Sequence, residues 1–293
     1  MVGNKGIKKW LVIAIFLLPN LIGIIIFMGI PIASSFILSF TEWDLIGDIK
    51  FVGLNNFIAI FKSNDFWRAL THTLYFIAGY LPLVMGFSLF FAIILNRKLK
   101  GIVIFRAIYF LPVISSWVAV SIIWKWLLNS QYGIINYALS FVGIIGPSWL
   151  QDPKWAMPAI IMTSVWKDTG FVLVMFLAGL QQISEDFYEA SNIDGASAWQ
   201  QFVKITLPLL APTTFFVLLI SLINSFQVFS QVWIMTEGGP AGSTSVMVEL
   251  IYKNAFRYFK MGYASALSWI LFAIIFILTI IQNKLQKRWV GYD

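Results

Sequence analysis

The sequence predicts an all-α polytopic membrane protein with six transmembrane helices, because it is highly apolar and its few charges are widely spaced. Of its 293 residues, 59% are hydrophobic and 11% are charged, whereas a soluble domain carries about 25% charged residues. Five uncharged runs approach or exceed the ~20 residues that a helix needs to cross a bilayer. This composition excludes a soluble enzyme, a nucleic-acid-binding protein and a disordered chain. The runs are residues 10–40, 69–95, 107–124, 205–236 and 261–283.

A sixth span is expected where two shorter apolar stretches meet at Lys167 and Asp168. Residues 155–166 and 169–183 are each too short to cross a bilayer, but with the ionisable pair they form one stretch of sufficient length. Six spans leave little room for a separate catalytic domain, so one transmembrane domain over residues 1–293 is expected. The expected spans are residues 10–40, 70–95, 103–128, 155–180, 211–235 and 262–283.

The distribution of basic residues predicts a multi-pass orientation with both termini in the cytoplasm. Lys and Arg concentrate on the cytoplasmic side of membrane proteins, and here they gather at both termini and in the second connection. The loops 41–68, 129–154 and 236–260 are then expected outside. Two features oppose this orientation: the connection between the fourth and fifth spans has only Lys204, and the last outer loop is basic. The basic residues at the two termini and in the second connection are Lys5, Lys8, Lys9, Arg97, Lys98, Lys100, Arg106, Lys284, Lys287 and Arg288.

No residue pattern in the sequence indicates catalysis or metal binding. The chain has no cysteine, which excludes disulfides and thiolate metal sites. It has no acid–histidine–nucleophile set, and its single histidine, His72, is expected to cap a helix or lie at an interface. The motif GxxxxGK[ST] does not occur, so ATP binding by that route is not expected. We therefore expect no catalytic residue, no metal and no cofactor in this chain.

The segment 181–212 differs from the rest because it is polar and predicts two short amphipathic helices. Ser184 is expected to cap a first helix whose acidic first turn suits the positive end of the helix dipole. Gly195 predicts a turn, and a second helix of about residues 196–206 is expected to end at Leu207-Pro208. Two interpretations stay open on physical grounds: a hairpin on the membrane surface, or a helical plug for a groove in a soluble partner.

One motif in this segment resembles the EAA loop of binding-protein-dependent ABC importer permeases. The family pattern is roughly EAA, two residues, DGA, a spacer and then F-x-x-I-x-LP, and this chain departs from it at Ser191, where the family has alanine. The motif is specific because a glutamate, an Asp-Gly-Ala and a Leu-Pro stand in register. The matching residues are Glu189, Ala190, Ser191, Asp194, Gly195 and Ala196, followed by Phe202, Ile205, Leu207 and Pro208.

Three further stretches resemble the maltose-type sugar permeases of that family, so the resemblance covers nearly the whole chain. The resemblance implies the transmembrane domain of an ABC importer with the fold of the maltose permease, in which residues 181–211 form the cytoplasmic coupling loop. It also implies a location in the bacterial cytoplasmic membrane. The stretches are LLPNLIGIIIF with SFTEWD and FVGLNNF, then FRAIYFLPVISS, then TEGGPAGSTSVMVELIYKNAF with GYASALSW.

The resemblance further implies the partners of the chain and the source of energy. Two permease chains, usually different ones, form the pore for a sugar or oligosaccharide, and two cytoplasmic ATPase subunits bind ATP and Mg²⁺. An extracellular or periplasmic solute-binding protein docks on the outer loops and delivers the solute. Glu189 would reach a basic or polar group in a cleft of the ATPase, and Gly195 would permit the turn between the two helices. Membrane lipid is a further partner, and nucleic acid is not.

The ionisable pair of the fourth span and a polar stripe of the fifth are the candidate solute contacts. A charge at bilayer depth costs roughly 2.5–3.5 kcal/mol or more, so Lys167 and Asp168 are expected to face protein or water. Polar residues of the fifth span lie at i, i+3 and i+4 and share one face. The resemblance implies sugar contacts in both places, whereas a structural ion pair and helix–helix hydrogen bonds remain alternatives. The candidate path residues are Ser164, Lys167, Asp168, Phe171, Ser221, Asn224 and Ser225.

Two other functions compete with the importer permease. An ion-coupled secondary transporter could use Lys167 and Asp168 for proton or sodium coupling, but six spans and the EAA-type motif argue against it. An intramembrane enzyme lacks a plausible set of catalytic residues. The solute itself is not named by the sequence.

Overall fold

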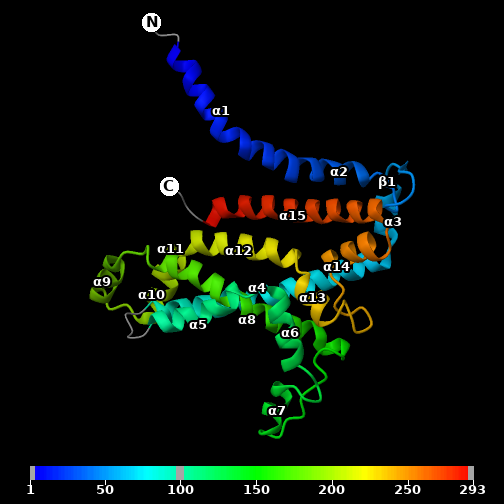
Figure 1. Cartoon of the computed structure of the whole chain (residues 1–293). Helices are drawn as coiled ribbons and strands as arrows, with labels where there is room; N and C mark the ends of the chain where they lie inside the picture. The colour runs from blue at the N-terminus through cyan, green and yellow to red at the C-terminus, as the bar shows by residue number, and fades with distance from the viewer. Residues whose placement is uncertain (1–3, 97–101, 290–293) are drawn as a thin grey trace. The chain divides into compact units, whose positions relative to one another are not determined.

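The structure, a computed structural model, describes residues 4–96 and 102–289, and these residues are mostly helical (Figure 1). The chain divides into two compact units, one of residues 1–63 with 251–272 and one of residues 64–250 with 273–293. The expected single transmembrane domain over residues 1–293 therefore stays a prediction. Three residues on which the predicted orientation partly rests, Arg97, Lys98 and Lys100, lie outside the described residues.

The first unit contains the N-terminal span, the loop that follows it and the beginning of the last helix. The candidate span covers residues 12–38, and none of its most apolar 18-residue window is buried within the chain. Such a surface suits the hydrocarbon of a bilayer and would be unfavourable in water. The elements are α1 (Asn4–Ile24), η1 (Ile25–Gly29), α2 (Ile30–Leu38), β1 (Thr41–Glu42), β2 (Lys50–Phe51), α3 (Asn55–Lys62) and η3 (Lys253–Arg257).

The loop after the first span lies against the start of α15 (Met261–Trp289). β1 and β2 pair as a short antiparallel ladder, and the carbonyl of Trp43 accepts a hydrogen bond of 3.0 Å from the backbone N–H of Met261. Gly262 is so close to Thr41 that a Cβ atom there would overlap the Thr41 carbonyl oxygen. Glycine is therefore required for this approach of the two backbones.

The second unit is a helical bundle built around α8, the most buried of the candidate spans. α4, α5, α6, α12 and α13 pack against it (Figure 1), and 67% of its most apolar window is buried. The elements are α4 (Asn64–Leu95), α5 (Ile102–Ile114), α6 (Trp117–Leu127), α7 (Ile134–Ser140), α8 (Pro153–Leu180), α9 (Glu185–Ile193), α10 (Ala198–Gln201), η2 (Phe202–Thr206), α11 (Leu207–Leu209), α12 (Ala211–Phe226), α13 (Ser230–Met235) and α14 (Met247–Tyr252).

Up to six spans are found among the described residues, in agreement with the predicted fold class. Four stretches are long and apolar enough to cross a membrane unaided. Two bent helix pairs, 107–114 with 117–127 and 198–209 with 211–226, bring the number to six if each pair is one span; their bends are 106° and 64°. The four unaided stretches are 12–38, 64–95, 153–180 and 261–286.

The expected third span over residues 103–128 is broken between α5 and α6, with a bend of 106°. Pro112 has no backbone N–H to donate to the preceding turn, and α5 ends two residues later. Ser116 then adopts an extended conformation (φ −65°, ψ 146°), and its Oγ accepts a hydrogen bond from the N–H of Ala119. The serine therefore caps α6 as a new helix in a different direction.

The expected fifth span over residues 211–235 is interrupted after Phe226, where α12 ends. Ser225 Oγ donates to the Leu222 carbonyl at 2.8 Å, and such a bond competes with the backbone bonds of a helix. The helix resumes as α13 at Ser230. The intervening polar backbone belongs to a cavity, which is described below.

The second short helix of residues 181–212 does not end at Leu207-Pro208, where the sequence predicted its end. A π-helical turn over Phe202–Thr206 comes first, and in it the N–H of Leu207 donates to the Phe202 carbonyl. This wider turn accommodates the proline, so the helical stretch continues through α11 before the 64° bend.

Gly170→Ala should destabilise the bundle, because a Cβ atom at Gly170 would overlap the carbonyl oxygen of Tyr109 on α5. The backbone of α5 would have to move, at a cost of about 1–3 kcal/mol. Gly86→Ala on α4 is the matched control, because no atom lies within 4 Å of the added carbon. Thermal unfolding of the purified complex should show a lower midpoint for Gly170→Ala alone, and equal midpoints would contradict this packing.

Candidate functional site

Lys167 of α8 is buried in the bundle, with 5% of its surface exposed. Its Nζ donates a hydrogen bond of 3.4 Å to the carbonyl of Val113, at the end of α5. The same ammonium lies 4.7 Å from the ring centroid of Trp117, at the start of α6, where a cation is attracted to the π face. The bend between α5 and α6 thus supplies both contacts of this lysine.

Asp168, the next residue of α8, contacts a different helix. Its Oδ2 accepts a hydrogen bond of 2.9 Å from the hydroxyl of Tyr80 on α4. Successive residues point about 100° apart around a helix, so Lys167 and Asp168 reach different neighbours. The alternative of a structural ion pair between helices does not match these contacts, because the partners are a carbonyl, an indole ring and a hydroxyl.

Asp168 and Tyr80 open on a cavity of about 300 Å³ between α4, α6, α8 and the break that follows α12. Polar groups and aromatic rings share its wall, the usual make-up of a small-molecule site. Phe76 and Tyr80 are stacked, with ring centroids 5.3 Å apart and an interplanar angle of 11°. We call this cavity the polar pocket; it is lined by Phe76, Tyr80, Trp117, Asp168, Asn224, Ser225, Gln227, Val228, Phe229, Ser230 and Gln231.

The polar pocket includes three of the seven predicted path residues: Asp168, Asn224 and Ser225. Lys167 does not line the polar pocket; its ammonium contacts the ring of Trp117, which does. Phe171 and Ser221 do not belong to its lining. The assignment of all seven to a solute path stays a prediction.

Ser164 does not line the polar pocket either; it makes a hydrogen bond between two helices. Its Oγ donates to the carbonyl of Ile160 at 2.8 Å and accepts a hydrogen bond of 3.2 Å from Nε2 of Gln231. Both Ser164 and Gln231 are buried. This bond joins α8 to α13, which is the helix–helix alternative considered for the polar residues of the spans.

Several pocket residues were not among the predicted path residues. Aromatic residues occur throughout the spans, so the sequence does not distinguish a pocket residue from a lipid-facing or interfacial one. Tyr80, Phe76 and Trp117 were missed for this reason. Gln227 and Gln231 were visible as polar residues in an apolar run, but helical periodicity gives no sign that the helix breaks between them.

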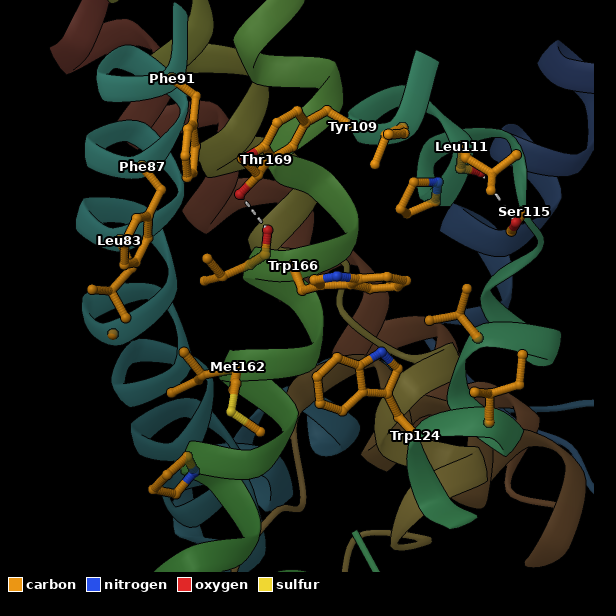
Figure 2. A pocket seen from close by; sticks show the side chains of 18 of the residues that line it. Leu83, Phe87, Phe91, Tyr109, Leu111, Ser115, Trp124, Met162, Trp166 and Thr169 are labelled. Carbon is orange, nitrogen blue, oxygen red and sulfur yellow. Dashed lines mark hydrogen bonds between the residues drawn. The ribbon is translucent and has the colours of Figure 1, made fainter. Parts of the chain in front are cut away.

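A second cavity, of about 940 Å³, has an almost wholly apolar wall and lies between α4, α5, α6 and α8. Figure 2 shows aromatic and aliphatic side chains, among them Phe87, Tyr109 and Trp166, along its sides. Trp124 and Trp166 meet edge to face at 5.5 Å. The hydroxyls of Ser115 and Thr169 donate to carbonyls of their own helices, so this cavity offers few groups to a polar solute.

His72 contacts the carbonyl of Ser245 through Nδ1 at 3.1 Å. This contact between the start of α4 and the segment before α14 agrees with the expected interface role. It gives no support to a proton relay through this histidine.

Residues 181–212 form two short helices joined by a turn at Gly195, as predicted, and we call them the hairpin. Ser184 caps α9 by accepting a hydrogen bond from the N–H of Asp186, and Gly195 turns the chain with φ +74°, a conformation that favours glycine. Ser197 and Gln200 form a capping box at the start of α10.

Two side-chain contacts hold the helices of the hairpin together. Gln201 Nε2 donates to Ser191 Oγ at 2.9 Å and to Asn192 Oδ1 at 2.6 Å. The hydroxyls of Tyr188 and Thr206 are 2.9 Å apart. The hydroxyl of Ser191, which replaces the alanine of the family motif, thus takes part in the hairpin contact.

Large apolar side chains of this hairpin are exposed. Ile193 is 87% exposed and Trp199 71% exposed, and Glu189 stands exposed on the same helix as Ile193. An exposed apolar patch rimmed by polar residues marks an interaction surface. Of the predicted coupling residues, Glu189, Ala190, Asp194 and Gly195 are exposed, whereas Ser191 and Ala196 are half-buried.

Comparison with known proteins identifies several relatives. Residues 57–291 match the family described as binding-protein-dependent transport system inner membrane component. The probable ABC transporter permease protein YesP of Bacillus subtilis is 40% identical, over 95% of this chain and 91% of the relative. The trehalose/maltose transport system permease protein MalF of Thermococcus litoralis is 35% identical, over 93% of this chain and 92% of the relative.

A solved structure has a closely similar fold. It is a chain of a bacterial alginate ABC transporter in complex with an alginate pentasaccharide-bound periplasmic protein. The TM-score is 0.85, the identity is 26%, and the match covers 98% of each chain.

Ser164→Ala should lower thermal stability, because it leaves the amide of Gln231 buried without this partner. A hydrogen bond between helices in a membrane is worth about 0.6–1.7 kcal/mol. Adding Gln231→Leu to Ser164→Ala removes both polar partners and should recover part of the loss. Unfolding midpoints of the two single variants and the double variant test this, and strictly additive losses would contradict a direct contact.

Proposed function

Because the chain belongs to the family of binding-protein-dependent transport system inner membrane components, and is thus a permease subunit of an ABC importer, we propose that its polar pocket passes a sugar or oligosaccharide. The observation that carries this proposal is the meeting of Asp168, Tyr80 and Asn224 with aromatic rings in one cavity inside the spans. The alternative of an ion-coupled transporter is not supported by the family.

The chemistry of the polar pocket suits a hydroxyl-rich solute. Sugar hydroxyls both donate and accept hydrogen bonds, and the amides of Asn224 and Gln227 offer both functions. The carboxylate of Asp168 accepts, and the rings of Trp117 and Phe229 supply apolar faces for a sugar ring. The MalF relative is named for transport of trehalose and maltose, which supports a sugar as the solute here.

The coupling hairpin is proposed to receive the energy of ATP hydrolysis from separate subunits. Two cytoplasmic ATPase subunits, with ATP and Mg²⁺, would hold the exposed face formed around Ile193 and Trp199 in a groove. Glu189 would bind a basic or polar group of that groove. The contacts of Gln201 with Ser191 and Asn192 would then transmit a displacement of the hairpin as a unit to α12.

The remaining partners follow from the same family. A second permease chain, different from this one, would complete the pore in the bacterial cytoplasmic membrane, and a solute-binding protein would dock from outside. The alginate transporter was solved with its periplasmic protein bound, which supports such docking here. Both termini and the hairpin would face the cytoplasm.

Asp168→Asn and Asn224→Ala should each reduce solute uptake roughly tenfold or more, because hydrogen bonds to charged groups are worth about 1.5–3 kcal/mol and neutral ones about 1 kcal/mol. Assembly and basal ATPase activity should persist. Asn283→Ala, at an exposed position of α15, is the matched control and should transport normally. ATP-driven sugar uptake into proteoliposomes measures the effect. Unchanged uptake in both variants, or failure of both to assemble, would overturn the assignment of the pocket.

Glu189→Lys should uncouple ATP hydrolysis from uptake or prevent binding of the ATPase, because it reverses the charge of an exposed side chain on α9. Glu189→Gln keeps the size of the side chain and should cause a smaller loss. The ratio of ATP hydrolysed to solute imported, together with co-purification of the ATPase, measures both effects. A Glu189→Lys complex that assembles and imports at the parent rate would refute the docking assignment.

A further inference from the structure

We propose that a second carbohydrate subsite lies at the outer end of the α6–α13 helix pair, and that it holds one part of a sugar chain while the polar pocket holds another. It is a cavity of about 370 Å³, which we call the outer pocket. This inference rests on the proposed function and extends it by a site that the predicted path residues do not include.

The two pockets follow one another along the same two helices. Trp117 and Gln231, near the starts of α6 and α13, line the polar pocket. Lys125 and Met235, near the ends of these helices, line the outer pocket. Lys125 lies eight positions after Trp117 on α6, which is about 12 Å at 1.5 Å per residue. Since α6 and α13 pack together, the outer pocket continues the line of the polar pocket.

The ends of the helix pair are joined by a hydrogen bond beside the outer pocket. Lys125 Nζ donates a hydrogen bond of 3.1 Å to the carbonyl of Ile234, in the last turn of α13. Immediately beyond, Thr236 Oγ1 bonds to the Val232 carbonyl and is 2.8 Å from Thr244 Oγ1. These bonds hold the wall of the outer pocket on the α13 side.

An indole ring in the wall of the outer pocket is held by two contacts. Trp149 lines the outer pocket, and its Nε1 donates a hydrogen bond of 2.7 Å to Asn136 Oδ1. Its ring meets Trp155 edge to face at 5.3 Å. Trp149 therefore offers a large apolar surface at little cost in side-chain entropy, as aromatic residues of binding sites do.

Two side-chain amides of the outer pocket are oriented by hydrogen bonds to their oxygen atoms. Ser130 Oγ donates to Gln151 Oε1 at 3.2 Å, and Asn129 Oδ1 accepts hydrogen bonds from the backbone N–H groups of Gln131 and Tyr132. These bonds use the acceptor atoms of both amides and leave their N–H donors for a ligand. Glu237 adds a carboxylate to the lining.

The chemical class of the ligand follows from this lining. One cationic and one anionic side chain, Lys125 and Glu237, face the same small volume, so a ligand of either net charge gains little. A neutral molecule with many hydroxyls and an apolar ring face fits the donors, the acceptors and the indole together. With about 370 Å³ the outer pocket, like the polar pocket, is at the low end of ligand sites, so a longer sugar chain would occupy both.

The test uses the absence of cysteine from the chain and single reporters in the assembled importer. Gln151→Cys and Ser130→Cys report on the outer pocket, Asn224→Cys on the polar pocket, and Gln131→Cys is the control next to the outer pocket. Maleimide labelling is followed in right-side-out vesicles with and without added maltose or trehalose. Sugar at about ten times its dissociation constant should slow labelling of Gln151→Cys and Ser130→Cys about tenfold and leave Gln131→Cys unchanged.

Each other outcome refutes the outer subsite in a distinct way. Protection of Asn224→Cys without protection of either outer reporter would remove the outer subsite and leave the proposed function standing. No protection at any reporter by either sugar would refute both. Protection of the outer reporters by sugar-free solute-binding protein, and not by sugar, would identify the outer pocket as a protein-docking contact instead.

Discussion

Two ionisable side chains of α8, Lys167 buried and Asp168 half-buried, set the constraint on which the rest of the bundle depends. A charge inside the spans is tolerated only with a partner or water, and Lys167 and Asp168 point in different directions from one helix. The lysine needs the Val113 carbonyl and the Trp117 ring, which requires the break between α5 and α6. The aspartate needs Tyr80, which fixes α4 against α8.

The two breaks in the spans serve the same cavity. Trp117 begins α6 just after the first break. Residues 227–229 form the second break, and Ser230 and Gln231 begin α13 after it. All of these residues line the polar pocket. Non-helical backbone at membrane depth is tolerated where it is buried in protein or lines a water-filled cavity. Both breaks therefore lie at the cavity that Asp168 and Asn224 line, so helix interruption and polar side chains coincide at one place in the bundle.

Much of the fold and part of the site could be predicted from the sequence. The length of the uncharged runs predicts the spans. Local signals such as Ser184 and Gly195 predict the hairpin of residues 181–212, because caps and turns depend on neighbouring residues. The role of Ser164 could not be predicted, since its partner Gln231 is distant in the sequence. Trp117 was missed because an aromatic residue in an apolar run gives no signal of what it contacts.

A structure of the assembled importer, determined with solute bound and ATP hydrolysis blocked, tests the central claim most directly. The account predicts solute density in the polar pocket, within hydrogen-bonding distance of Asp168 and Asn224 and against the ring of Trp117. Solute bound elsewhere in the spans, with Asp168 in contact with Tyr80 alone, would contradict it. In that case the charges of α8 would serve only to hold the bundle together.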